Sequence, residues 1–153
     1  MSLKLTYQGS LNDLECFVQK FLQTVPNGAI VGLSGELGSG KTTLVRAIIK
    51  AIAKKNKQLI DRVISPSFVL HQSYENLNPP VHHFDLYRME SVTEAMLVEL
   101  EYYEILENVR FKKGFLFVEW PEMCVDPKIL GLDATIAIKI IQESRSYEIE
   151  VLQ

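Results

Sequence analysis

The feature that most constrains this chain is a glycine-rich segment at residues 35–42, which reads Gly-Glu-Leu-Gly-Ser-Gly-Lys-Thr. It matches the pattern G-x-x-x-x-G-K-[ST] without a mismatch. Before it, Ala29–Leu33 is a short apolar run bounded by glycines, which is typical of a buried strand. After it, one helical stripe carries Leu44, Val45, Ile48, Ile49 and Ile52. The pattern therefore predicts a strand, a tight backbone turn and a helix in direct succession.

The residue types of this loop suit a polyphosphate. Glycines let the backbone curl so that successive N–H groups point inward, and the following helix presents its positive N-terminus to an anion. Lys41 would supply an ammonium to the β and γ phosphates, and Thr42 a hydroxyl to Mg²⁺. We expect the nucleotide-binding residues to be Gly38, Ser39, Gly40, Lys41, Thr42 and Thr43.

Glu119 is the first candidate for the carboxylate that such a loop needs near its metal. It follows the apolar run Phe115–Val118, which predicts a buried strand that ends in an acid. Ligands of open α/β sheets bind at the carboxyl ends of the strands, where this pattern puts Glu119. We therefore prefer Glu119, together with Thr42, as the metal-binding pair.

Asp85 is the second candidate carboxylate. It lies in the strand-like segment Val81–Arg88, whose pleat would place His83, Asp85 and Tyr87 on one face. From the residues alone, Asp85 is the alternative to Glu119 as the acid that holds the metal's water shell or orients the attacking water.

The rest of the chain alternates strand and helix patterns. The expected elements are an edge strand at Leu3–Tyr7, a helix from the N-cap Ser10 to Val25, strands at Phe68–Tyr74 and Val81–Arg88, a helix from a Ser91/Glu94 capping box to about Asn108, and a hairpin of Ala134–Ile141 with Tyr147–Leu152. This order predicts an α/β fold: a P-loop NTPase-like three-layer sandwich with a mixed, mostly parallel sheet and a C-terminal β-hairpin. We expect one domain over residues 1–153.

Composition excludes several classes of protein. With 47% hydrophobic and 23% charged residues, the chain is not globally disordered. No apolar stretch approaches the ~18 residues of a membrane span, and the first residues lack the apolar core of a secretory signal. A net charge of −3 argues against direct nucleic-acid binding. Two distant cysteines, Cys16 and Cys124, favour a reducing compartment, so we expect a cytoplasmic protein without membrane contact.

Three further motifs have more ordinary interpretations. His82 and His83 are neighbours on a predicted strand and would point to opposite faces, so we interpret them as core or surface histidines rather than a metal pair. Trp120 could form a wall of the nucleotide site or belong to the core. Ser65–Ser67 could contact a γ-phosphate, but a Ser-Pro-Ser segment is also an ordinary turn.

Four segments together resemble the TsaE (YjeE) family of bacterial P-loop ATPases. They are GELGSGKTT, SPSF at Ser65–Phe68, HFDLYR at His83–Arg88 and VEWPE at Val118–Glu122, and they occur in the family's order and approximate spacing over residues 10–122. The resemblance implies a mixed-sheet P-loop fold. It also implies a role in the threonylcarbamoyl modification of the adenosine next to the tRNA anticodon.

The resemblance assigns roles to individual residues. It implies ATP in the glycine-rich loop, Mg²⁺ on Thr42 and Glu119, and a part in ATP hydrolysis for Asp85. Arg46 matches the family's arginine after GKTT, and Glu36 stands where the family usually has aspartate. Its implied partner is a TsaD–TsaB complex, through which the protein would meet tRNA only indirectly.

The expected function is thus a Mg²⁺-dependent ATPase with low turnover, whose catalytic residues are Lys41, which positions the phosphates, and Asp85, which positions or deprotonates the attacking water. One alternative is a small-molecule kinase, in which the basic cluster Arg110–Lys113 would be the lid over the phosphates. The other is a nucleotide-gated assembly factor in which ATP occupancy alone matters.

Overall fold

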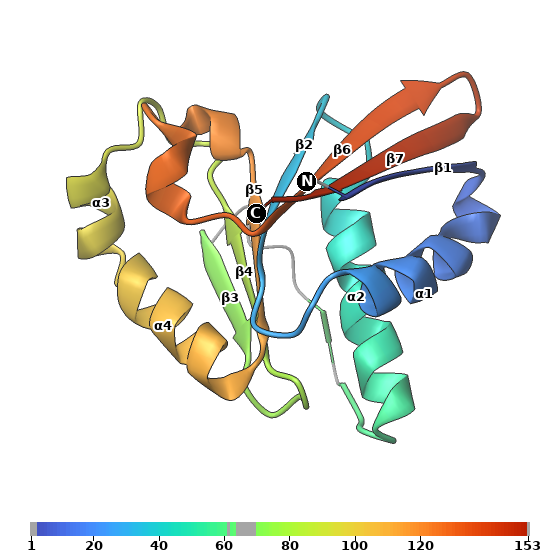
Figure 1. The fold of residues 1–153 in the computed structure, drawn as a ribbon, viewed down its shortest axis with the longest axis horizontal. Coiled ribbons are helices and arrows are strands. Elements are labelled where there is room, and N and C mark those ends of the chain that lie inside the picture. The colour runs from blue at the N-terminus through green and yellow to red at the C-terminus, as the bar shows by residue number, and fades with distance from the viewer. Residues whose placement is uncertain (1–2, 61, 64–69, 153) are drawn as a thin grey trace.

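The computed structural model describes residues 3–60, 62–63 and 70–152 (Figure 1). Its sheet has the strand order β1-β7-β6-β2-β5-β4-β3. The strands are β1 (Leu3–Gly9), β2 (Ile30–Gly35), β3 (His71–Tyr74), β4 (Val81–Asp85), β5 (Phe115–Glu119), β6 (Ala134–Ile141) and β7 (Ser144–Val151). The α-helices are α1 (Leu14–Thr24), α2 (Lys41–Lys55), α3 (Glu94–Glu99) and α4 (Tyr102–Lys112).

Parallel pairing at the centre of the sheet positions the glycine-rich loop. β2 pairs in parallel with β5 on one side and with β6 on the other, and β5 pairs in parallel with β4. The outer pairs β1–β7, β6–β7 and β3–β4 are antiparallel. The predicted α/β fold with a mixed sheet and a C-terminal hairpin is confirmed. The carboxyl ends of β2, β4 and β5 meet at one edge of the sheet.

Helices cover both faces of the sheet, as Figure 1 shows for α1 and α2 on one side and α3 and α4 on the other. On β5, Phe115 and Phe117 pack with α1, where the ring of Phe21 lies 5.6 Å and 5.8 Å from theirs between centroids. The intervening Leu116 and Val118 belong to a different cluster of buried side chains, which also contains Leu97 of α3 and Tyr102 of α4. Because β5 is buried on both faces, it has a continuous apolar sequence rather than an alternating one.

The helix predicted from Ser91 to about Asn108 is instead two helices, α3 and α4. Ser91 has a φ of 48°, and the N-cap is Thr93, whose hydroxyl accepts a hydrogen bond from the Met96 amide at 3.3 Å. The break lies at Glu101, with a φ of 57°. After it, the buried Tyr102 donates its hydroxyl hydrogen to the Leu130 carbonyl at 2.7 Å. This long-range contact sets the direction of α4, which local pattern could not reveal.

β4 also ends earlier than predicted, at Asp85 rather than Arg88. The Asp85 carboxylate accepts a hydrogen bond from the Tyr87 amide at 3.0 Å, so its side chain closes a turn over its own backbone. The predicted strand from Phe68 is described only from His71, as β3, and Ser65–Phe68 lie outside the described residues. The hairpin is confirmed, with β7 beginning at Ser144.

Candidate active site

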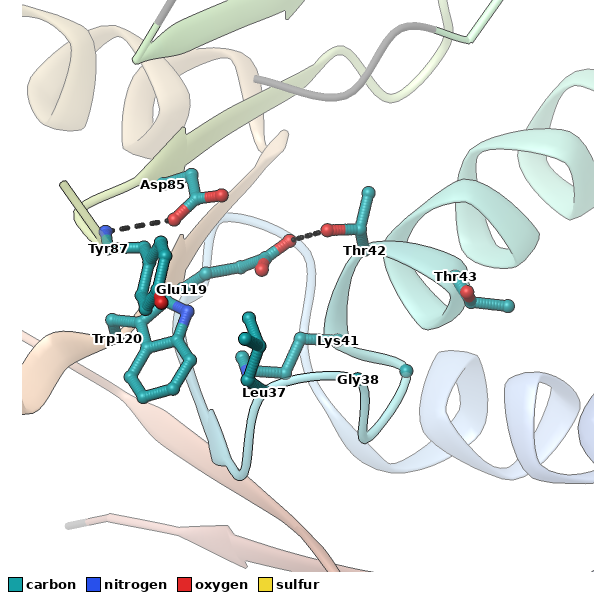
Figure 2. A pocket seen from close by; sticks show the side chains of 10 residues that line it. Leu37, Gly38, Lys41, Thr42, Thr43, Asp85, Tyr87, Glu119 and Trp120 are labelled. Atoms are coloured by element: carbon teal, nitrogen blue, oxygen red, sulfur yellow. Dashed lines mark hydrogen bonds between the residues drawn. The ribbon is translucent and has the colours of Figure 1, made fainter. Parts of the chain in front are cut away.

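A cavity of about 210 Å³ opens where the loop after β2 meets the ends of β4 and β5 (Figure 2). Its lining residues are Leu37, Gly38, Gly40, Lys41, Thr42, Thr43, Asp85, Tyr87, Glu119 and Trp120. The structure thus brings the two predicted carboxylates to the glycine-rich loop. Ser39, by contrast, is not among the lining residues, and its side chain is buried.

The loop turns within a few residues from the end of β2 into the first turn of α2. The Ser39 amide donates to the Glu36 carbonyl at 3.0 Å and closes the turn. Gly40 then precedes α2 with a φ of 105°, a backbone conformation that is strained for residues with a Cβ atom but accessible to glycine. Gly40 therefore lets the chain enter the helix with its N-terminal amides toward the cavity.

Lys41 is buried, although it carries the ammonium expected to bind phosphate. Its Nζ donates to the Gly35 carbonyl at 2.7 Å and to the Glu36 carbonyl at 3.0 Å, and it lies 4.0 Å from the centre of the Trp120 ring. Burial lowers the pKa of Lys41, and the Glu119, Glu122 and Asp85 carboxylates oppose this shift. Carbonyl groups and an indole face do not neutralise the ammonium, so its charge remains available to an anionic ligand.

Thr42 and Glu119 form the predicted metal-binding pair. The Thr42 hydroxyl donates to Glu119 Oε1 at 2.7 Å, as Figure 2 shows. Glu119 is almost fully buried, and the same oxygen lies 2.8 Å from His83 Nε2. Hydroxyl and carboxylate oxygens are the ligands that Mg²⁺ prefers, and Mg²⁺ is commonly bound by one or two carboxylates plus substrate phosphates. The residues present therefore fit such an ion.

Within the described residues, no group of three or more His, Cys, Asp or Glu side chains could hold a metal by itself. Mg²⁺ at Thr42 and Glu119 would take further ligands from water and from the oxygens of its substrate.

Asp85 lies beside Glu119 because β4 and β5 pair in register at these two residues. Both side chains extend from the carboxyl ends of parallel strands, and both are almost fully buried. The bond from the Tyr87 amide to Asp85 Oδ1 fixes the orientation of this carboxylate at the cavity wall. Asp85 can therefore hold a water molecule or a proton next to the hydrogen-bonded Thr42 and Glu119.

His83 is a site residue that our sequence interpretation missed. The two histidines do point to opposite faces, as predicted, and His83 is buried. Its imidazole, however, contacts the carboxylate of Glu119 rather than packing only among apolar side chains. Its spacing of two from Asp85 was the signal that could have revealed it, since both lie on the face of β4 that leads to the cavity.

Trp120 lines the cavity and, half-buried, also packs against the buried cluster that contains Leu116 and Val118, so the structure is compatible with both interpretations given to it. It follows β5 with a φ of 59°, and its ring lies 5.0 Å from that of Tyr87 between centroids. Ser65–Ser67, the other candidate for contact with a phosphate, lie outside the described residues.

Comparison with known proteins identifies the family. A family model described as threonylcarbamoyl adenosine biosynthesis protein TsaE matches residues 9–149. The chain belongs to the TsaE family. The resemblance inferred from the four sequence motifs is thus confirmed, and the TsaE family takes part in threonylcarbamoyladenosine biosynthesis.

Individual TsaE proteins are similar over much of the chain. The protein from Synechocystis is 31% identical over 112 residues, which are 73% of this chain and 66% of that protein. The one from Rickettsia typhi is 36% identical, covering 70% of this chain and 67% of the relative. The one from Aquifex aeolicus is 29% identical over 94% of this chain and 92% of its own. The chain thus spans about two thirds of the length of the Synechocystis and Rickettsia typhi proteins.

A solved structure supports the fold. Bacillus subtilis YdiB superposes with a TM-score of 0.70 at 18% sequence identity, over 100% of this chain and 88% of that chain. This likeness shows a shared α/β architecture. None of the described helices of our chain is long and apolar enough to cross a membrane.

Proposed function

We propose that this chain is a Mg²⁺-dependent ATPase with slow turnover that acts in threonylcarbamoyladenosine synthesis on tRNA. The observation that carries the proposal is the meeting of Lys41, the Thr42–Glu119 pair and Asp85 around one cavity. A cation, two oxygen ligands and a second carboxylate are the parts that phosphoryl transfer to water requires. Membership of the TsaE family supports the tRNA pathway.

Each residue has a distinct task in this proposal. The loop amides and Lys41 bind the β and γ phosphates, and Thr42 and Glu119 hold Mg²⁺, which neutralises charge on the phosphate oxygens when bound. Asp85 orients the attacking water and accepts its proton. Trp120 and Tyr87 form the wall beside the two carboxylates and limit access of bulk water. The prediction that residues 38–43 bind ATP is part of this proposal.

The sequence supports ATP rather than GTP, because it lacks an Asn/Thr-Lys-x-Asp motif that would read guanine. We further propose that the protein acts on a TsaD–TsaB complex in the cytoplasm, and that it meets tRNA only through that complex. Its net charge of −3 is consistent with an indirect role at the tRNA.

The kinase alternative loses its main support. In the cluster proposed as a lid, Arg110 pairs with Asp133 at 3.3 Å and Lys112 pairs with Glu75 at 2.9 Å. Neither residue is among those that line the cavity. These cations therefore bind other parts of the protein, where they can stabilise α4.

The direct test is Lys41→Ala. Each charge-assisted hydrogen bond to a phosphate contributes about 1.5–3 kcal/mol, so ATP affinity or turnover should fall at least about tenfold. Lys50→Ala is the matched control, because Lys50 is an exposed lysine of the same helix and does not line the cavity. Calorimetric ATP binding and ADP release give the readout. Unchanged affinity and turnover in Lys41→Ala would refute the proposal.

The pathway needs a separate experiment. Modification of tRNA is reconstituted with TsaD and TsaB, with and without this chain, and threonylcarbamoyladenosine is quantified. We expect the chain to increase sustained product formation in the presence of ATP. Equal product without it would contradict the proposed role, whereas ADP release that depends on a phosphorylated small molecule would favour the kinase.

A further inference from the structure

Arg145 joins the C-terminal hairpin to the glycine-rich loop. Its Nε donates a hydrogen bond to the Ser39 carbonyl at 3.1 Å, although the two residues are 106 positions apart in the sequence. A second bond, from Nη1 to the Ser144 carbonyl at 3.2 Å, holds the guanidinium against its own strand. Neither Arg145 nor this contact was anticipated from the sequence.

The sheet places the hairpin beside the loop. β6 pairs in parallel with β2 up to the pair Gly35 and Ile138, and β7 returns along β6 with Arg145 opposite Ile140 (Figure 1). The backbones are so close that a Cβ at Gly35 would lie 2.6 Å from the Ile138 carbonyl oxygen. Arg145 therefore reaches the loop from a neighbouring, firmly paired strand.

The bond to the Ser39 carbonyl also determines the direction of an amide. In a planar trans peptide, the C=O of one residue and the N–H of the next point in opposite directions. Because the Ser39 carbonyl points to the guanidinium, the Gly40 N–H points away from the hairpin. Gly40 is one of the residues that line the cavity.

We propose that Arg145 is a positioning residue for the phosphate-binding loop: it holds the Ser39–Gly40 peptide so that the Gly40 amide faces a bound phosphate. This inference rests on the proposed function, since it requires a polyphosphate ligand. Arg145 does not itself touch the phosphate. Its charge polarises the peptide and strengthens the Gly40 amide as a donor.

The other bonds to nearby loop carbonyls explain why this one matters. Lys41 donates to Gly35 and Glu36, and the Leu44 amide donates to Gly40 within the first turn of α2. Lys41 is also the cation expected to bind the ligand. Arg145 is anchored outside the loop, so it can keep its peptide oriented whether the loop is empty or loaded.

The test compares Arg145→Met and Arg145→Lys with the unaltered chain, using ADP and inorganic tripolyphosphate with Mg²⁺ in calorimetric titrations. Loss of a charge-assisted hydrogen bond predicts a Kd about tenfold higher for both ligands in Arg145→Met. Arg145→Lys keeps the charge and a donor and should recover part of this loss. In ATP hydrolysis the KM should rise, with kcat within about threefold, because the amide binds substrate and transition state alike.

Lys139→Met is the matched control. Lys139 is an exposed cation on β6 of the same hairpin, opposite Ser146, so its loss removes the same charge without the bond to Ser39. Its Kd should stay within about twofold of the unaltered chain. Thermal unfolding without ligand shows whether each variant is folded; if Arg145→Met unfolds, Arg145→Gln takes its place.

The outcomes separate the two proposals. If the unaltered chain binds neither ADP nor tripolyphosphate, the proposed function fails and this inference fails with it. If the unaltered chain binds both while the folded Arg145 variants bind equally well, Arg145 is not a positioning residue and the proposed function stands. An equal loss in Lys139→Met would also overturn the inference, because the effect would then be general charge.

Discussion

Two adjacent histidines of β4 belong to polar clusters that differ in kind. On the face toward α4, His82 Nε2 lies 3.0 Å from Glu75, which also binds Lys112 at 2.9 Å. His71 stacks on His82 and Phe84, with centroid distances of 5.3 Å and 4.4 Å. We call these residues, His71, Glu75, His82 and Lys112, the edge cluster.

On the opposite face, His83 contacts Glu119, which also accepts the bond from Thr42 and lies beside Asp85. The ammonium of Lys41 contacts carbonyls and an indole rather than either carboxylate. We call His83, Thr42, Lys41, Asp85 and Glu119 the cavity cluster.

The two clusters differ in the partner of their lysine ammonium group, which is a carboxylate in the edge cluster and backbone carbonyls in the cavity cluster. In the edge cluster, opposite charges pair directly, so little remains for a ligand, and the ion pair at the surface contributes modestly to stability. In the cavity cluster, the Lys41 ammonium contacts carbonyls and an indole beside an open volume and does not pair with Glu119, which costs stability and favours a charged ligand. Substitutions in the edge cluster should therefore change folding, and those in the cavity cluster should change chemistry.

The largest effect is expected for Asp85→Asn. Removal of a group that positions or deprotonates water reduces turnover by about 10²–10⁴-fold, while ATP affinity should change little because the loop and Lys41 remain. ADP release and calorimetric binding of ATP measure the two quantities. Full hydrolysis in this variant would exclude the role of Asp85. A variant without hydrolysis that still supports tRNA modification would favour the nucleotide-gated assembly factor.

Glu119→Gln should act through the metal. An amide is a weaker ligand for Mg²⁺ than a carboxylate, so the Mg²⁺ concentration for half-maximal turnover should rise at least about tenfold, with lower turnover throughout. A magnesium titration of ADP release checks this. An unchanged requirement for Mg²⁺ would remove Glu119 from the metal site.

Substitutions of His82 and His83 test whether the edge cluster and the cavity cluster have different roles. His83→Leu deprives the buried Glu119 of one hydrogen bond, so turnover at limiting Mg²⁺ should fall several-fold, about 0.5–1.5 kcal/mol in free energy. His83→Gln can replace the Nε2 donor and should recover part of the loss. The control is His82→Leu, which should leave turnover unchanged. Equal losses of turnover in His82→Leu and His83→Leu would contradict a division between the clusters.

The smallest effect concerns pH and the edge cluster. Burial, with the nearby charges of His82 and His83, lowers the pKa of His71 to about 4, while Glu75 opposes the shift; burial also lowers the pKa of His82. From pH 6.5 down to about 4, the unfolded chain therefore binds a proton before folded His71 does, and stability falls. Allowing for partial exposure, His71 should account for about 1–2 kcal/mol of this loss.

Denaturant unfolding at pH 7 and pH 4.5 measures this contribution. In His71→Phe, which can keep the ring stacking on Phe84, the fall in unfolding free energy between the two pH values should be smaller than in the unaltered chain. The same fall in both proteins would show that His71 does not contribute.

The sequence was sufficient to predict the structure where residues close together in the chain determine it. The tight turn of residues 35–42 between β2 and α2 was predicted from its glycines and from the apolar stripe of the helix that follows. Glu119 could be located because an apolar strand directly precedes it, and parallel pairing then brings it to Asp85. The assignment of cofactors and catalytic roles to these residues remains a prediction.

The sequence was not sufficient to predict features that depend on specific side-chain contacts, most of them between residues far apart in the chain. The break at Glu101 accompanies the packing of Tyr102 against Leu130, 28 residues further along the chain. The turn at Asp85 is local, but it depends on a hydrogen bond from the Tyr87 amide that hydrophobic periodicity does not reveal. Arg145 reaches Ser39 only because β6 pairs with β2. Hydrophobic periodicity does not encode such contacts, so the hydrogen bond between the hairpin and the loop could not be predicted from the sequence.

The central claim is that the loop of residues 35–42 binds the phosphates of a nucleotide. A crystal structure of the chain with a non-hydrolysable ATP analogue and Mg²⁺ tests it most directly. Our account predicts electron density for the β and γ phosphates against the Gly40 and Lys41 amides, with the metal between Thr42 and Glu119. Density for the analogue elsewhere on the protein, or none at millimolar concentration, would contradict it.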